Sequence, residues 1–140
     1  TIFFGFETIA DEANFQEATR KLSEAIDSFD PEEIYTLHPI LDRHSSHRAA
    51  GQITLDACKN RDVSIWAYEV WGLFAEWDRF EDISDHIETK LTAINEHRSQ
   101  VAAIPYTEGV AGLNRWRAIF ADPHQATVPC AYAEVFVKLR

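Results

Sequence analysis

The chain has 140 residues, of which 46% are hydrophobic and 12% aromatic, and this composition excludes a disordered polypeptide. Its formal net charge of −10 argues against a nucleic-acid-binding surface, because such a surface needs clustered cations. No apolar run approaches the roughly 20 residues that a membrane helix requires. We therefore expect one globular domain over residues 1–140, and the isolated Cys58 and Cys130 favour a reducing, cytoplasmic location.

The start of the chain predicts a strand and then a helix. Residues 2–6, Ile-Phe-Phe-Gly-Phe, indicate a short buried strand. The chain contains no methionine and begins with Thr1, so we expect that a natural N-terminal segment is missing. Apolar residues then recur at helical spacing over Ala13–Phe29, with Asp11 as a cap and Pro31 as the stop.

Strands and helices alternate through the rest of the sequence. Strands are predicted at Glu33–Leu37, Val63–Trp71, Phe80–Ile83 and Ala131–Leu139, and helices at Arg48–Asn60, Ser84–Val101 and Gly109–Phe120. Because such alternation is typical of a parallel sheet between helical layers, we expect an α/β fold. The specific prediction is a Rossmann-like three-layer sandwich with a mostly parallel sheet, incomplete at its N-terminus.

The residues that can carry chemistry follow the predicted strand 33–37, in the loop Asp42-Arg43-His44-Ser45-Ser46-His47. Sites in open α/β sheets form at the carboxyl ends of strands, where this loop lies. His44 and His47 are three residues apart and can converge on one site. A neutral imidazole can bind zinc, and a protonated imidazole can stabilise the negative charge that develops during a reaction. Taken alone, the spacing is more typical of two surface histidines without a metal.

The context of this histidine pair resembles a known family. Residues 44–51, His-Ser-Ser-His-Arg-Ala-Ala-Gly, resemble the HPDHRAAG-type motif of the LmbE-like deacetylases, the family of N-acetylglucosaminyl-phosphatidylinositol de-N-acetylase (PIG-L). Further matches follow in order and cover most of the chain: Tyr68-Glu69-Val70-Trp71 is similar to a YEVW strand, residues 81–84 to a helix entry, residues 90–100 to a helix ending in HRSQ, and residues 133–136 to a final AEAF strand.

The resemblance implies a zinc-dependent hydrolase that removes the N-acetyl group of an N-acetylglucosamine-type sugar or sugar conjugate. It implies that His47 binds zinc and that His44 is catalytic, polarising or protonating the reacting amide. The other two zinc ligands and the base belong to an N-terminal AHPDDE motif that this sequence lacks. We therefore expect zinc only in a longer natural chain, and no activity from these 140 residues alone. Ser45 and Ser46 replace the usual Pro and Asp, which gives a less stiff loop and one carboxylate fewer.

Other side chains near these motifs have two interpretations each. Asp42 can orient an imidazole or touch substrate hydroxyls, or simply cap its loop. Trp77 can stack on a sugar, whereas Trp66 and Trp71 lie on a predicted strand and are expected in the core. His38 is expected to be a loop histidine with its hydrogen bonds satisfied.

The end of the helix predicted from Ser84 is a second supporting region. His97, Arg98 and Gln100 are expected either to support the site or to form an ordinary polar helix terminus. The expected partner is an N-acetylated sugar-type small molecule, and a homo-oligomer is compatible with the sequence. The alternative function is a non-catalytic α/β binding module, a degenerate or truncated relative of the enzymes.

Overall fold

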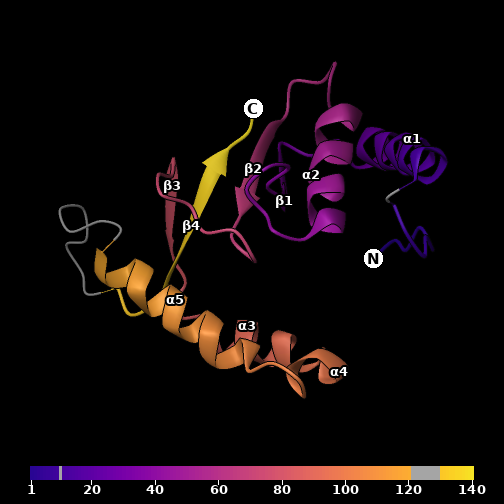
Figure 1. Ribbon diagram of the computed structural model, residues 1–140. Coiled ribbons are helices and arrows are strands. Elements are labelled where there is room, and N and C mark those ends of the chain that lie inside the picture. The colour runs from indigo at the N-terminus through magenta and orange to yellow at the C-terminus, as the bar shows by residue number, and fades with distance from the viewer. Residues whose placement is uncertain (10, 121–129) are drawn as a thin grey trace. The chain divides into compact units, whose positions relative to one another are not determined.

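The computed structural model describes residues 1–9, 11–120 and 130–140, and the chain divides into two compact units (Figure 1). Unit 1 comprises Thr1–Asp78 and Phe136–Arg140, and unit 2 comprises Arg79–Val135. The histidine loop therefore belongs to unit 1, and the predicted supporting residues His97, Arg98 and Gln100 belong to unit 2.

Unit 1 begins with helix α1 (Glu12–Phe29), whose two ends are set by local signals in the sequence. Oδ1 of Asp11 accepts a hydrogen bond from the backbone N–H of Asn14 at 2.9 Å, so the predicted cap is confirmed. The helix ends before Pro31, at Asp30, which adopts the left-handed conformation with φ 45°. The N–H of Asp30 donates to the carbonyl of Ile26 and closes the last turn.

The sheet of unit 1 combines parallel and antiparallel pairing. Strand β1 (Glu33–Leu37) runs parallel to β2 (Ser64–Tyr68), from Glu33 opposite Ser64 to Leu37 opposite Tyr68. Helix α2 (Ser45–Ala57) provides the crossover that a parallel pair requires. The end of β4 (Ala133–Lys138) pairs antiparallel with β2, which gives unit 1 the strand order β1-β2-β4. The predicted α/β class is confirmed, with a sheet that is partly parallel.

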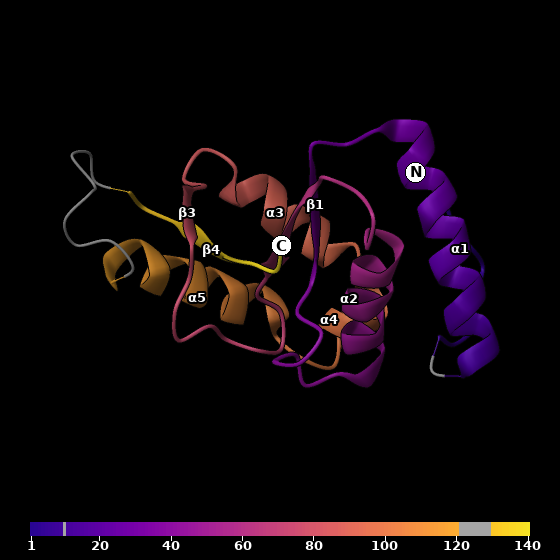
Figure 2. The ribbon, with the colours of Figure 1, turned by 90° about the horizontal axis from the view of Figure 1, so that it is seen from above.

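Helices α2 and α1 pack in succession next to β1. Helix α2 packs against β1, and α1 packs against α2, as the two views in Figures 1 and 2 show. The partly buried Ile34 of β1 packs against the apolar core, whose buried residues come from α1, from the end of α2 and from β2 with the residue before it: Ile26, Ala57, Cys58, Val63 and Ile65. This packing fixes α2, and with it the histidines at its start, relative to the end of β1.

Unit 2 contains β3 (Arg79–Asp82), three helices and the start of β4. The helices are α3 (Ile87–Asn95), α4 (Arg98–Val101) and α5 (Tyr106–Phe120). The buried Asn114 of α5 joins its neighbours: its Oδ1 accepts from Nζ of Lys90 at 2.9 Å, and its Nδ2 donates to the carbonyl of Ala133 at 2.8 Å. No helix within the described part of the chain has the length and apolarity needed to cross a membrane.

Two predicted elements differ from the structure. Residues 2–6 form no strand, and Phe3 is exposed rather than buried. Gly5, at φ 72°, interrupts the extended backbone there, and a strand also needs a hydrogen-bonding neighbour that this segment does not have among the described residues. The single helix predicted from Ser84 to Val101 is divided at His97, whose ψ of 54° is not helical. No proline or glycine marks this break in the sequence.

Candidate functional site

The histidine loop joins the end of β1 to the start of α2, and a glycine brings these two elements unusually close. A Cβ added to Gly51 would lie 2.2 Å from the carbonyl oxygen of Leu37, so only glycine allows α2 to approach the strand end as it does. A buried hydrogen bond of 3.0 Å between the hydroxyls of Thr36 and Thr54 joins the same two elements. The middle of α2 is therefore held directly beside the carboxyl end of β1.

The segment after β2 is held against the same loop. A Cβ at Gly72 would lie 2.3 Å from the carbonyl oxygen of Leu41, so the backbone at Gly72 touches the backbone of the histidine loop. Two parallel strand ends thus contribute neighbouring loops to one place.

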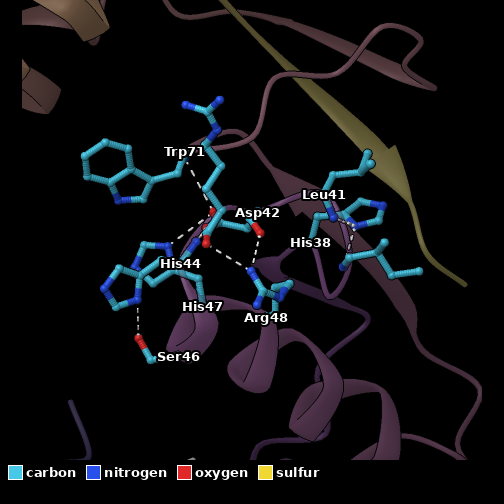
Figure 3. Close-up of polar contacts among 10 residues, drawn as sticks. His38, Leu41, Asp42, His44, Ser46, His47, Arg48 and Trp71 are labelled. Atoms are coloured by element: carbon cyan, nitrogen blue, oxygen red, sulfur yellow. Dashed lines mark hydrogen bonds and ion pairs between the residues drawn. The ribbon is translucent and has the colours of Figure 1, made fainter.

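Asp42 lies at the centre of this arrangement (Figure 3). Its side chain is only 3% exposed. Oδ1 accepts a hydrogen bond from the backbone N–H of His44 at 2.8 Å, while Oδ2 lies 3.2 Å from Nδ1 of His47 and accepts from the backbone N–H of Trp71 at 3.4 Å. One buried carboxylate therefore contacts the loop, the first turn of α2 and the segment after β2.

The two histidines lie side by side at the start of α2. Their ring centroids are 5.0 Å apart with an interplanar angle of 41°. Nδ1 of His44 lies 2.7 Å from the hydroxyl of Ser46, and the side chain of His47 is 28% exposed. Arg48 donates from Nη1 to the carbonyls of Asp42 and Arg43, at 2.9 and 3.0 Å, which holds the loop backbone to the helix. Both rings can thus be reached by a molecule from outside.

His38 has a structural role in the same loop. Its Nδ1 accepts hydrogen bonds from the backbone N–H groups of Ile40 and Leu41, both at 3.1 Å. Burial lowers the pKa of His38, which favours the neutral ring that these two bonds require. His38 is therefore a loop histidine with satisfied hydrogen bonds, as the sequence predicted.

The side chains around the histidines offer few donor groups for a metal ion. Across the described ranges of the chain, no three or more His, Cys, Asp or Glu side chains are grouped so that they can hold a metal ion. Asp42 already contacts two backbone N–H groups and His47. The described residues therefore do not supply the three protein ligands that catalytic zinc usually has.

Trp71 was expected in the core, and the structure places it elsewhere. It follows the end of β2, it is 40% exposed, and its indole lies on the same side of Asp42 as the two imidazoles (Figure 3). Trp66, on the strand itself, is buried as expected. The signal for Trp71 was its position just beyond a strand parallel to the one that precedes the histidines.

The other expected site residues lie at the end of the first segment of unit 1 and in unit 2. Trp77 is partly exposed near the end of the first segment of unit 1, and its role stays a prediction. In unit 2, His97 precedes α4 without capping it, and Arg98 is an exposed partner of Glu96 at 3.2 Å. Arg98 thus has the contact expected of a polar helix terminus.

No family model matches the chain, and no curated protein matches its sequence. Solved structures do share its fold. The 4-carboxy-2-hydroxymuconate hydratase GalB of Pseudomonas putida is 17% identical, with a TM-score of 0.69 over 89% of this chain. The N,N'-diacetylchitobiose deacetylase of Pyrococcus horikoshii is 21% identical, with a TM-score of 0.63 over 89%. A teicoplanin deacetylase in its zinc-inhibited form is 15% identical, with a TM-score of 0.62 over 99%.

These similarities show a shared fold only, because sequence identities of 15–21% do not establish a shared function. The chain spans 59%, 51% and 60% of the lengths of the hydratase and the two deacetylases, respectively. The α/β fold of this chain is thus shared with a diacetylchitobiose deacetylase and a teicoplanin deacetylase, and with a hydratase as well.

Proposed function

We propose that this chain is part of a zinc-dependent deacetylase that hydrolyses the N-acetyl group of an N-acetylglucosamine-type sugar or sugar conjugate. The observation that carries the proposal is the pair His44 and His47, with ring centroids 5.0 Å apart at the start of α2. The pair lies at the carboxyl end of β1, on a fold shared with solved deacetylases. The resemblance of residues 44–51 to the LmbE-like motif supports the same assignment.

In this proposal His47 is one zinc ligand, and the remaining ligands come from residues outside the described set. Zinc, when bound, supplies a water of lowered pKa and polarises the acetyl carbonyl. The lengths of the matched structures, of which this chain spans 51–60% in the three compared, leave room for such residues in the whole protein. Zinc inhibition of the teicoplanin deacetylase supports metal binding on this fold.

His44 is the proposed acid. Its ring is adjacent to that of His47, and the hydroxyl of Ser46 contacts Nδ1, which leaves Nε2 as the nitrogen that can face a substrate. Hydrolysis breaks the amide C–N bond: water supplies the oxygen that acetate gains, and the departing nitrogen takes up a proton to leave as an amine. A protonated His44 can donate that proton and stabilise the negative charge that develops on the carbonyl oxygen.

Trp71 is the proposed contact for the sugar. Its partly exposed indole lies on the side of the loop where the imidazoles lie, and the apolar face of a pyranose packs well on an aromatic ring. Asp42 fixes the backbone of Trp71, so the ring position depends on the same carboxylate as the histidines.

The test is acetate release from N-acetylglucosamine conjugates by the protein as its gene encodes it, together with its zinc content. His47→Ala is expected to lower the zinc content. His44→Gln is expected to keep the zinc and to reduce kcat by about 100- to 10,000-fold. His86→Gln is the matched control, because His86 is an exposed histidine that makes no capping hydrogen bond. Unchanged zinc content in His47→Ala, with no acetate released by the wild type, would contradict the proposal.

A non-catalytic binding module is the second candidate. The observation that favours it is the absence of a three-donor group among the described residues. It predicts that the natural protein, purified from its source, contains no zinc and binds N-acetylated sugars without releasing acetate. Intact mass and metal analysis of the same sample distinguish the two candidates.

A further inference from the structure

We propose that Asp42 is a positioning residue that holds His47 in one tautomer, with the proton on Nδ1 and the lone pair of Nε2 directed away from the loop. The tautomer itself follows from contacts within unit 1. Only the last step, in which Nε2 serves as a zinc ligand, rests on the proposed function.

The tautomer follows from what the two facing atoms can do. A carboxylate oxygen only accepts hydrogen bonds, and Oδ2 of Asp42 lies 3.2 Å from Nδ1 of His47. A neutral imidazole can fill this contact only if its single N–H is on Nδ1. Nε2 then has no hydrogen and can bind a metal or accept a proton.

The position of the carboxylate does not depend on His47. The backbone N–H of His44 holds Oδ1 at 2.8 Å, and the backbone N–H of Trp71 donates to Oδ2. The side chain is 3% exposed, so water does not compete for these bonds as it would at the surface. Asp42 is therefore oriented by two loops before it contacts the imidazole, and it can impose its geometry on the ring.

His44 provides a contrast within the same pair. Its Nδ1 faces the hydroxyl of Ser46 at 2.7 Å, and a hydroxyl can either donate or accept. Ser46 thus permits both neutral tautomers and the protonated ring of His44. The arrangement therefore fixes the lone pair of His47 and leaves the hydrogen position on the ring of His44 unfixed.

The first measurement is a long-range ¹H–¹⁵N spectrum of the wild-type chain at mildly alkaline pH, where imidazoles are neutral. The expected result for His47 is a pyrrole-type Nδ1 and a pyridine-type Nε2. The exposed His86 reports the tautomer mixture of an imidazole without a carboxylate partner. A pyrrole-type Nε2 in His47 would overturn the proposal, and this result needs no variant.

The second measurement uses Asp42→Asn. The N–H of His44, at 2.8 Å, holds the amide oxygen more strongly than the N–H of Trp71, at 3.4 Å, so the NH₂ group turns toward His47, donates to its Nδ1 and reverses the tautomer. The control is Thr54→Val, which removes the buried hydroxyl contact between α2 and β1 without touching the histidines. The tautomer is expected to reverse in the first variant only. A His47 tautomer that is unchanged in Asp42→Asn, or reversed in both variants, would show that Asp42 does not set it.

The third measurement is the zinc affinity of the natural protein. Asp42→Asn is expected to weaken zinc binding by about 10- to 100-fold, as the loss of a carboxylate behind a histidine ligand does elsewhere. If the wild-type tautomer is as expected but the natural protein binds no zinc, the positioning role of Asp42 holds and the proposed function fails.

Discussion

Gly51 of α2 lies so close to Leu37 of β1 that a Cβ at position 51 would be 2.2 Å from the Leu37 carbonyl oxygen. The same hypothetical atom would be 3.0 Å from the backbone nitrogen of Pro39, so both neighbours are rigid backbone. The contact sets the distance between the strand end and the helix that begins directly after His44 and carries His47.

Gly51→Ala is therefore expected to destabilise unit 1, even though alanine favours a helix over glycine by about 1 kcal/mol. Inserting a methyl group into a packed interface costs about 1–3 kcal/mol, and backbone atoms cannot move aside as a flexible side chain can. The measurement is the free energy of unfolding in urea.

Gly112→Ala is the matched control, because a Cβ at Gly112 in α5 meets nothing within 4 Å. It is expected to stabilise the protein by about 0.5–1 kcal/mol. Stabilisation by both substitutions would show that α2 does not depend on the close approach at Gly51.

His38 predicts a pH dependence of stability. Burial lowers its folded-state pKa below the ordinary value of 6.5, so the unfolded chain binds more protons as the pH falls below that value. The contribution of His38 is thus fully present above about pH 6.5 and is lost progressively on acidification, when a proton on Nδ1 would break the bonds from Ile40 and Leu41.

His38→Asn is the variant that isolates this effect. The asparagine oxygen can accept the same two N–H groups but does not titrate. The loss in free energy of unfolding from neutral pH to about pH 5 is expected to be smaller in the variant than in the wild type. Equal losses in the two proteins would mean that the neutral ring of His38 does not contribute.

The elements predicted correctly are those whose signals are local. Asp11 and Pro31 delimit α1 within a few residues, and the strand from Glu33 to Leu37 is bounded as predicted. The prediction of a strand at residues 2–6 was wrong because a strand requires a hydrogen-bonded neighbouring strand. The sequence alone does not show whether such a neighbour is present. The break at His97 has no local signal and could not have been anticipated.

The candidate site likewise combines features that the sequence predicted with features that it did not. The loop of His44 and His47 was predicted from its place between a strand and a helix, and the structure adds the contact of Asp42 with both residues. The prediction that Trp71 lies in the core was wrong because its environment depends on the parallel pairing of β1 and β2. This pairing brings two loops that are distant in sequence to one edge of the sheet. Such a neighbour relation follows from topology rather than from side-chain pattern.

Trp71 and Trp77 form a comparison that tests the proposed sugar contact. Trp71→Ala is expected to raise KM for an N-acetylated sugar substrate roughly two- to tenfold with little change in kcat, because stacking lost equally from substrate and transition state affects binding alone. Steady-state kinetics of both alanine variants distinguish the two rings. A larger rise in KM for Trp77→Ala than for Trp71→Ala would instead support the sequence-based prediction that Trp77 contacts the sugar.

Asn114 is the residue of unit 2 with the clearest energetic role. Asn114→Ala would deprive Lys90 and the carbonyl of Ala133 of a partner each, and such a loss at a buried site costs about 1–3 kcal/mol. Thr107→Ala, which removes an exposed hydrogen bond to Asn95, is expected to change stability by no more than about 0.5 kcal/mol. Thermal unfolding monitored by circular dichroism checks both, and equal shifts in Tm would contradict the bridging role of Asn114.

Unit 1 is assembled from both ends of the sequence, and this has a consequence for biosynthesis. The backbone N–H of Leu139 donates to the carbonyl of Ile65 at 2.8 Å, and Arg140 donates from Nη2 to the carbonyl of Arg61. A ribosome therefore makes the histidine loop long before it makes the strand that completes the sheet around β2. Until residues 136–140 emerge, β2 has an unpaired edge, and a nascent chain in that state is a natural substrate for chaperones.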